Sequence, residues 1–165
     1  MSISILETAL ADLVTEVKNI TIANSYRNTL GMVSKTYLDV AQITDYPAVS
    51  VVFNNGNIDT VDSAITVFNE NVDVALIGYV SGELSSKGDN NALVDSAESL
   101  LHDLKVCLAA FVKKYLNTSA KHYIINRRKD TFKMFRVLPV PGTTKGIVGI
   151  YFQIVILRQT GDFST

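Results

Sequence analysis

The sequence has 165 residues, of which 47% are hydrophobic and 19% charged, and its net charge is −1. A chain of this length forms one domain with a core that needs no disulfide or metal, and its single cysteine, Cys107, excludes an internal disulfide. The small share of charged residues leaves two interpretations open: a well-filled core, or apolar surface covered by other chains.

The net charge conceals an uneven distribution along the chain. Residues 1 to 99 hold 13 acidic and 4 basic side chains, a net −9, whereas residues 100 to 165 hold 3 acidic and 11 basic, a net +8. A fold that separates the two halves would be dipolar and would favour head-to-tail contact between copies, which closes into a ring when the rotation allows. The alternative is that the two sets intermix in space and neutralise each other.

The N-terminal third begins with an amphipathic helix and continues with irregular structure. Apolar residues at three-and-four spacing and the capping box formed by Ser4 and Glu7 predict a helix over residues 4 to 18. The residues before it have no basic leader, so we expect neither a signal peptide nor a membrane span, and a soluble intracellular protein. Between Tyr26 and Val40 the pattern favours one or two irregular strands.

Three strands are predicted next. The first covers residues 45 to 53 and enters through Pro47, which has no N–H for a ladder; we expect a turn at residues 54 to 57 after it. Residues 63 to 68 and 72 to 80 are rich in strand-forming residues, and the intervening residues 69 to 71 have the composition of a hairpin loop. We therefore predict that these two runs pair antiparallel.

A polar loop over residues 81 to 88 precedes a long helix, predicted over residues 90 to 116. Asp95 and Glu98 lie early in this helix and Lys113 and Lys114 late, as the helix dipole favours. Cys107 falls among the apolar positions, where a thiol is usually inert packing. The inward stripe comprises Leu93, Ala97, Leu100, Leu101, Leu104, Leu108, Phe111 and Tyr115.

The C-terminal part is predicted to be all strand. Residues 122 to 126 and 131 to 138 flank a basic tip and favour another hairpin, and the almost continuously apolar run from 147 to 157 indicates a strand covered on both faces. The chain is thus expected to be a single α+β domain spanning residues 1 to 165. Its mixed, mainly antiparallel sheet would carry two amphipathic helices on one face, with hairpin extensions.

No pattern of catalytic or metal-binding residues emerges. His102 lies one turn after Glu98 and favours an exposed ion pair, and His122 opens a strand, which favours a surface role. One thiol and two scattered imidazoles lack zinc spacing. The loop from Gly82 to Gly88 resembles a phosphate loop only superficially, because its lysine is misplaced. We expect no enzyme activity, no metal and no cofactor.

Charged residues in loops and turns are the candidates for contact with partners. Clustered cations can bind phosphate, protein or only solvent, and the acidic N-terminal part argues against general DNA binding. The candidate contact residues are Asp59, Asp62, Glu70, Asp73, Glu83, Lys87, Arg127, Arg128, Lys129 and Arg136.

The order of the predicted elements resembles that of the tail terminator, or tail completion, proteins of long-tailed bacteriophages. The segments that carry the resemblance are Asp45 to Val51, Val72 to Val80 and Asn91 to Ala97. The resemblance covers most of the chain in the order of its elements but only short stretches in amino-acid sequence. The segment from Ala120 to Leu138 is longer than in the simplest pattern of the family.

The resemblance implies a virion protein, assembled in the host bacterial cytoplasm, that forms a ring of typically six copies. Such a ring caps the tail tube, stops its elongation and provides the surface for head joining, with tube and connector or neck proteins as partners. DNA would pass through the lumen without specific binding, and no membrane is involved. The alternatives are another connector or neck protein, or a small ligand-binding module or enzyme with a loop lid.

Overall fold

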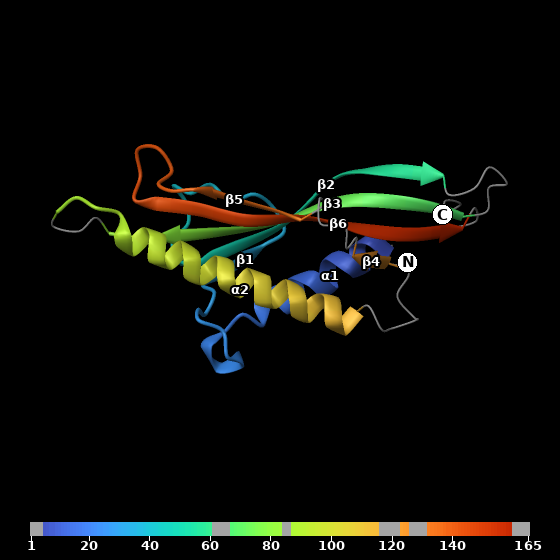
Figure 1. Cartoon of the computed structure of the whole chain (residues 1–165), viewed down its shortest axis with the longest axis horizontal. Coiled ribbons are helices and arrows are strands. Elements are labelled where there is room, and N and C mark those ends of the chain that lie inside the picture. Colours follow the sequence, from blue (N-terminus) through green and yellow to red (C-terminus); the bar gives the residue numbers. More distant parts are fainter. Residues whose placement is uncertain (1–4, 61–66, 84–86, 116–122, 126–131, 160–165) are drawn as a thin grey trace.

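The computed structural model describes residues 5 to 60, 67 to 83, 87 to 115, 123 to 125 and 132 to 159. In these ranges six strands form one mixed sheet, and two α-helices lie on one side of it (Figure 1). The chain therefore adopts the predicted α+β class. The strands are β1 (Met32–Ser34), β2 (Ala48–Thr60), β3 (Val67–Ser81), β4 (Tyr123–Ile125), β5 (Lys133–Val137) and β6 (Lys145–Gln159).

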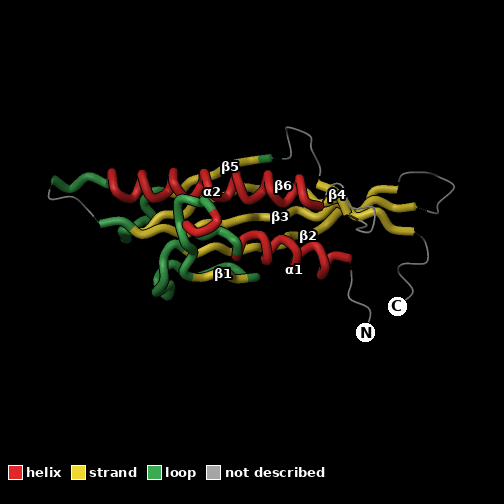
Figure 2. The backbone as a smooth tube through the Cα atoms, turned by 90° about the horizontal axis from the view of Figure 1, so that it is seen from below, coloured by secondary structure: helices red, strands yellow, loops and turns green. Residues whose placement is uncertain are grey.

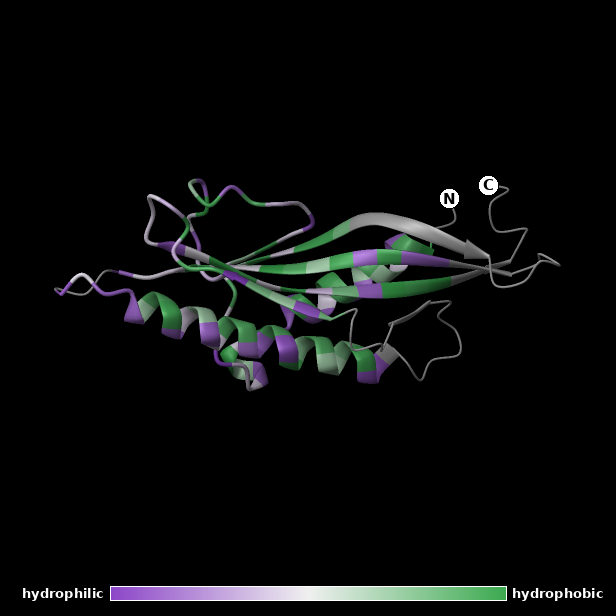
Figure 3. Cartoon of the chain, turned by 45° about the horizontal axis from the view of Figure 1, so that its top comes forward, coloured by the Kyte–Doolittle hydropathy of each residue, from purple (hydrophilic) through white to green (hydrophobic). Residues whose placement is uncertain are grey.

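The sheet order is β1, β2, β3, β6, followed by an edge that β4 and β5 share. Strand β1 runs parallel to β2, and all other pairs are antiparallel. Three of the strands have 13 to 15 residues, so the longest extend about 50 Å at roughly 3.3 Å per residue. Figure 3 shows that much of their length is hydrophobic.

Helices α1 (Ile5–Lys18) and α2 (Asn91–Tyr115) confirm the two helix predictions within one residue at each end. The predicted stripe of α2 is buried from Leu93 to Phe111, and Tyr115 lies outside the residues whose side chains are described. Close packing requires a glycine below the helix, because a Cβ on Gly78 of β3 would lie 2.6 Å from Leu100 Cδ2. Hydrophobic and hydrophilic bands alternate along α2 (Figure 3).

The two faces of the sheet are covered differently. The helical face, which includes Val49, Leu76 and Phe152, packs against α1 and α2 in the main core. The opposite face, here called the loop-covered face, includes Ala48, Ala75, Ile77 and Tyr79. It packs against the covering segment, residues 38 to 46, in a second cluster. The last strand, β6, is thus covered by other parts of the same chain on its helical face and partly on its loop-covered face, where Tyr151 remains 37% exposed. The prediction that this strand is covered on both faces is therefore confirmed in part.

Two predicted turns are wrong because residues typical of turns lie inside long strands. The turn expected at residues 54 to 57 is replaced by a register shift between Phe53 and Gly56, after which β2 continues to Thr60. A glycine inside a strand is characteristic of such a bulge. The loop expected at residues 69 to 71 is instead part of β3, where pairing with both β2 and β6 holds the backbone extended.

The predicted hairpin over residues 122 to 138 is also wrong. Strands β4 and β5 both pair antiparallel with β6, so they run in the same direction along one edge (Figure 2). Ile125 pairs with Ile154, and Lys133 pairs with Tyr151. The two paired positions are thus 8 residues apart on the edge but only 3 residues apart on β6, so the edge has 5 more residues between them than β6 has. The basic residues 127 to 129 lie outside the described residues.

Candidate assembly surfaces

Strand β5 forms one outer edge of the sheet and carries exposed apolar side chains. Met134 is 60% exposed and Val137 43%. Phe135, between them, stacks on Tyr151 of β6 with ring centroids 4.8 Å apart, and it packs against the cluster on the loop-covered face. In the described chain no strand pairs with the other side of β5. The edge therefore combines unpaired backbone with apolar surface.

Arg136, a predicted contact residue, lies on β5 but is engaged within the chain. Its Nη1 lies 2.5 Å from Glu98 Oε1 of α2, and both side chains are about half exposed. The expected ion pair of Glu98 with His102 is therefore replaced by one that joins the helix to the edge strand. An exposed pair of this kind adds little stability, so Arg136 remains able to exchange Glu98 for another partner.

The predicted acidic residues that the structure describes on the long strands lie on β2 and β3 and do not form a single cluster. Glu70 and Asp73 are three residues apart on β3, so they point to opposite faces. Asp73 accepts a hydrogen bond from Gln153 Nε2 at 2.8 Å. Asp59 pairs through its backbone with Asn69.

The other candidate residues lie elsewhere. Glu83 and Lys87 are exposed between the end of β3 and the start of α2. Asp62, Arg127, Arg128 and Lys129 lie outside the described residues.

Among the described residues, two ion pairs join the acidic and the basic half of the chain. Besides Glu98 and Arg136, Lys114 of α2 lies 2.5 Å from Glu16 of α1, whose side chain is only 8% exposed. Each pair joins an acidic residue from the first 99 positions to a basic residue from the remainder. Part of the charge is thus neutralised within the chain, as the alternative reading of the charge pattern predicted.

A buried carboxylate that the sequence reasoning missed fastens residues 20 to 30, here called the anchored segment, to α2. Asp103 is 1% exposed. It accepts hydrogen bonds from the backbone N–H groups of Arg27 and Asn28 at 3.0 and 2.9 Å and from Asn28 Nδ2 at 2.7 Å. The available signal was its position three residues after Leu100, on the inward side of the helix.

Cys107 lies near this carboxylate and is buried, as predicted for an inert thiol. Burial raises the pKa of the Cys107 thiol to about 12, and the nearby carboxylates of Glu16 and Asp103 act in the same direction. Burial likewise raises the pKa of Tyr26 to about 12, with smaller contributions from Cys107, Glu16 and Asp103. A thiol that stays protonated at neutral pH is a poor nucleophile.

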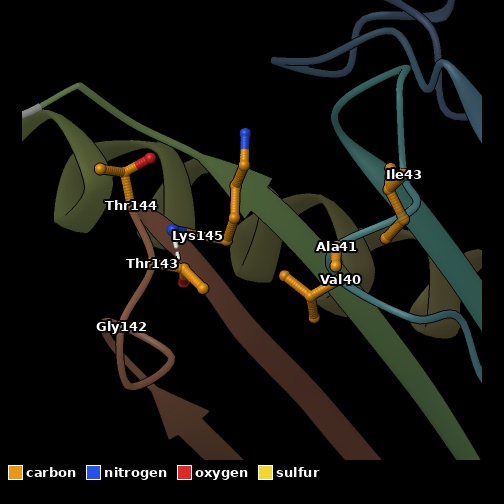
Figure 4. Close-up of a pocket in the computed structure, with 7 residues that line it drawn as sticks. All are labelled: Val40, Ala41, Ile43, Gly142, Thr143, Thr144 and Lys145. Carbon is orange, nitrogen blue, oxygen red and sulfur yellow. Dashed lines mark hydrogen bonds between the residues drawn. The ribbon is translucent and has the colours of Figure 1, made fainter.

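An open depression of about 700 Å³ lies between two loops (Figure 4). Of its lining residues only Lys145 is ionisable, and the Lys145 Nζ donates to Ser81 Oγ at 2.7 Å and lies 4.4 Å from the ring centroid of Tyr46. This lining therefore offers no acid–base pair. It consists of Val40, Ala41, Ile43, Gly142, Thr143, Thr144 and Lys145.

Other kinds of site receive no support from the described residues. Within these ranges, no three or more histidine, cysteine, aspartate or glutamate side chains gather as a metal site would require. No helix there has the length and apolarity of a membrane span. Comparison with known proteins identifies no family, since neither any protein-family model nor any curated protein matches the chain.

Proposed function

We propose that this protein is a structural subunit of a long-tailed bacteriophage virion that forms a ring on the end of the tail tube. In this proposal the ring stops tube elongation and provides the surface to which the head is joined. The proposal follows the resemblance to tail terminator proteins, in which rings typically contain six copies. Its partners are further copies of the chain, the tube protein and the connector or neck proteins.

The observation that supports assembly best is the state of the two sheet edges. In the described chain, neither β1 nor β5 has a strand partner on its outer side. Large apolar side chains remain exposed there, with Met32 at 42% and Met134 at 60%. Soluble proteins usually protect such edges, so two open, apolar edges favour a chain that is completed by its neighbours.

The alternative of a ligand-binding module or enzyme has less support. A catalytic cleft needs convergent polar groups, usually with a base near a nucleophile. The depression beside Lys145 is instead lined by loop hydroxyl groups and by the apolar side chains of Val40 and Ile43. The other alternative, a different connector or neck protein, is distinguished by its partner, because the proposed terminator binds the end of the tail tube.

Electron microscopy and sedimentation of the purified protein test the proposal. We expect rings of one size, alone or after addition of tube protein, and we expect them to persist at high salt because apolar contacts are not screened as exposed charges are. Tube protein polymerised with the chain present should give shorter tubes than without it. A monomer under every condition, at low and high salt and with tube protein present, would contradict the proposal.

A further inference from the structure

At each outer edge of the sheet an exposed apolar side chain lies on the loop-covered face, whereas Met134 of β5 lies on the helical face. On the β1 side Met32 is 42% exposed, and Tyr37, three residues after the strand, is 59% exposed. On the β5 side Val137 is 43% exposed, and Tyr151 of the neighbouring strand is 37% exposed. Met32 and Val137 both belong to the loop-covered face, because the pairing register aligns them with Ala48 and Ile147.

The two edges also lie at the same level along the strands. Met32 pairs with Ala48, Ala48 with Tyr79, Tyr79 with Ile147, and Ile147 with Val137, so one row of residues crosses the whole sheet. Figure 2 shows β1 and β5 on opposite edges at a similar position along the long axis. A neighbour that continues this row needs no displacement along the strands. Such a contact can close into a ring, whereas a displaced one generates a helical filament.

The strand directions allow the row to continue from one copy to the next. Strand β1 is parallel to β2, and each later step across the sheet to β5 is antiparallel. Three antiparallel steps separate β2 from β5, so β1 and β5 of one copy run in opposite directions. A rotation about an axis along the strands therefore brings β5 of one copy antiparallel to β1 of the next, the arrangement that two edges need to form ladder hydrogen bonds.

We propose that β5 of one copy pairs antiparallel with β1 of the next copy, with Val137 opposite Met32 and Phe135 opposite Ser34. This inference rests on the proposed ring and identifies the surfaces that build it. The register joins two exposed apolar side chains on one face, and it places Arg136 opposite Val33, so no like charges face each other. Strand addition of this kind gains both backbone hydrogen bonds and apolar burial.

Disulfide cross-linking tests the register directly. In the Met32→Cys/Val137→Cys variant the new thiols of neighbouring copies would be directly opposite, within the Cα separation of 4.4 to 6.8 Å that disulfides span. After mild oxidation we expect a ladder of covalent multimers up to the ring size on a non-reducing gel, at least about tenfold more than in either single variant. Single variants should stay uncrosslinked, because position 32 of one copy faces position 137 of the next copy and never position 32 of another copy.

The Met32→Cys/Met134→Cys variant is the matched control, since position 134 lies on the opposite face and three residues out of register. It should give no ladder, and Cys107, buried in every variant, adds no background. Circular dichroism confirms that each variant folds. As a second measurement, Val137→Lys should leave the monomer folded and reduce ring formation at least about tenfold, because it puts a charge into an apolar contact.

The outcomes separate this inference from the proposed function. Rings with the expected ladder support both. Rings that assemble without cross-linking at positions 32 and 137, or that cross-link in a single variant through a two-fold contact, overturn the inference and leave the ring function standing. A chain that is monomeric under all conditions overturns the proposed function and this interface together.

Discussion

The two faces of the sheet are buried by different means. The helical face packs against α1 and α2 and contributes to a cluster that includes Leu13, Leu104 and Phe111, all 0% exposed. The loop-covered face is closed by the covering segment, and its cluster is smaller and includes Ile43 at 9% exposure. Helices bury a wide stripe of apolar side chains, whereas a short irregular segment buries few. We conclude that the helical face supplies most of the stability.

The covers are also fastened by different chemistry. The anchored segment is held by the buried carboxylate of Asp103. The covering segment is held to the sheet by a phenol, because Tyr79 Oη accepts the Leu38 N–H at 3.2 Å. Within the segment, Tyr46 Oη donates to the Val40 carbonyl at 3.0 Å. Hydrogen bonds to a charged group are stronger than those between neutral groups. The loop-covered face should therefore open before the helical face does.

The largest effect is expected from truncation of the main core. Leu104→Ala should lower the free energy of unfolding by about 3 to 5 kcal/mol, because the side chain is fully buried and leaves a cavity. The matched substitution on the other face, Ile43→Ala, should cost about 2 kcal/mol, since the covering segment can relax around it. Urea unfolding of both variants measures the difference, and equal losses would contradict the ranking of the two faces.

A smaller effect is expected from the fastening groups. Asp103→Asn should lower the free energy of unfolding by about 2 to 4 kcal/mol. Both carboxylate oxygens accept a backbone N–H group, whereas the amide of asparagine turns its own N–H group toward one of these donors. Tyr79→Phe removes one neutral acceptor and should cost about 1 kcal/mol. Hydrogen exchange should show loss of protection around residues 26 to 28 in the first variant and around residue 38 in the second. Faster exchange in the opposite segments would reverse the assignment.

The smallest effect depends on pH and concerns the helical face alone. The folded protein keeps the Cys107 proton up to a pKa of about 12, whereas an unburied thiol loses it near 9.0. Above pH 9 the unfolded chain binds fewer protons than the folded one, so the free energy of unfolding falls as pH rises through the window from 9 to 12. Between pH 8 and pH 10 the loss from this group should be about 1 kcal/mol.

Cys107→Ala provides the control for this alkaline loss. Its stability should fall less between pH 8 and pH 10 than that of the unsubstituted protein, whatever the cost of the substitution itself. Tyr26, whose pKa is also raised to about 12, keeps its own contribution above pH 10 in both proteins. Urea unfolding at the two pH values measures the slopes, and identical slopes would show that the buried thiol does not carry the effect.

Local sequence patterns determined the helices, the buried stripe of α2, the inert Cys107 and the α+β class. These features depend on spacing within one element, such as that of Leu100, Leu104 and Cys107, so the sequence displays them directly. The strand β6 was likewise evident from its continuous apolar run. The candidates Asp73 and Arg136 are exposed, and their role in contact with partners stays a prediction; their partners within the chain, Gln153 and Glu98, were not foreseen.

Tertiary structure alone decided where the strands end and which edges stay open. Residues 54 to 57 and 69 to 71 have turn composition, yet pairing with neighbouring strands keeps them extended, because backbone hydrogen bonds from distant segments outweigh weak local preferences. The same non-local pairing placed β4 and β5 on one edge instead of in a hairpin. The row from Met32 to Val137, on which the proposed interface depends, exists only because five segments distant in sequence share one register.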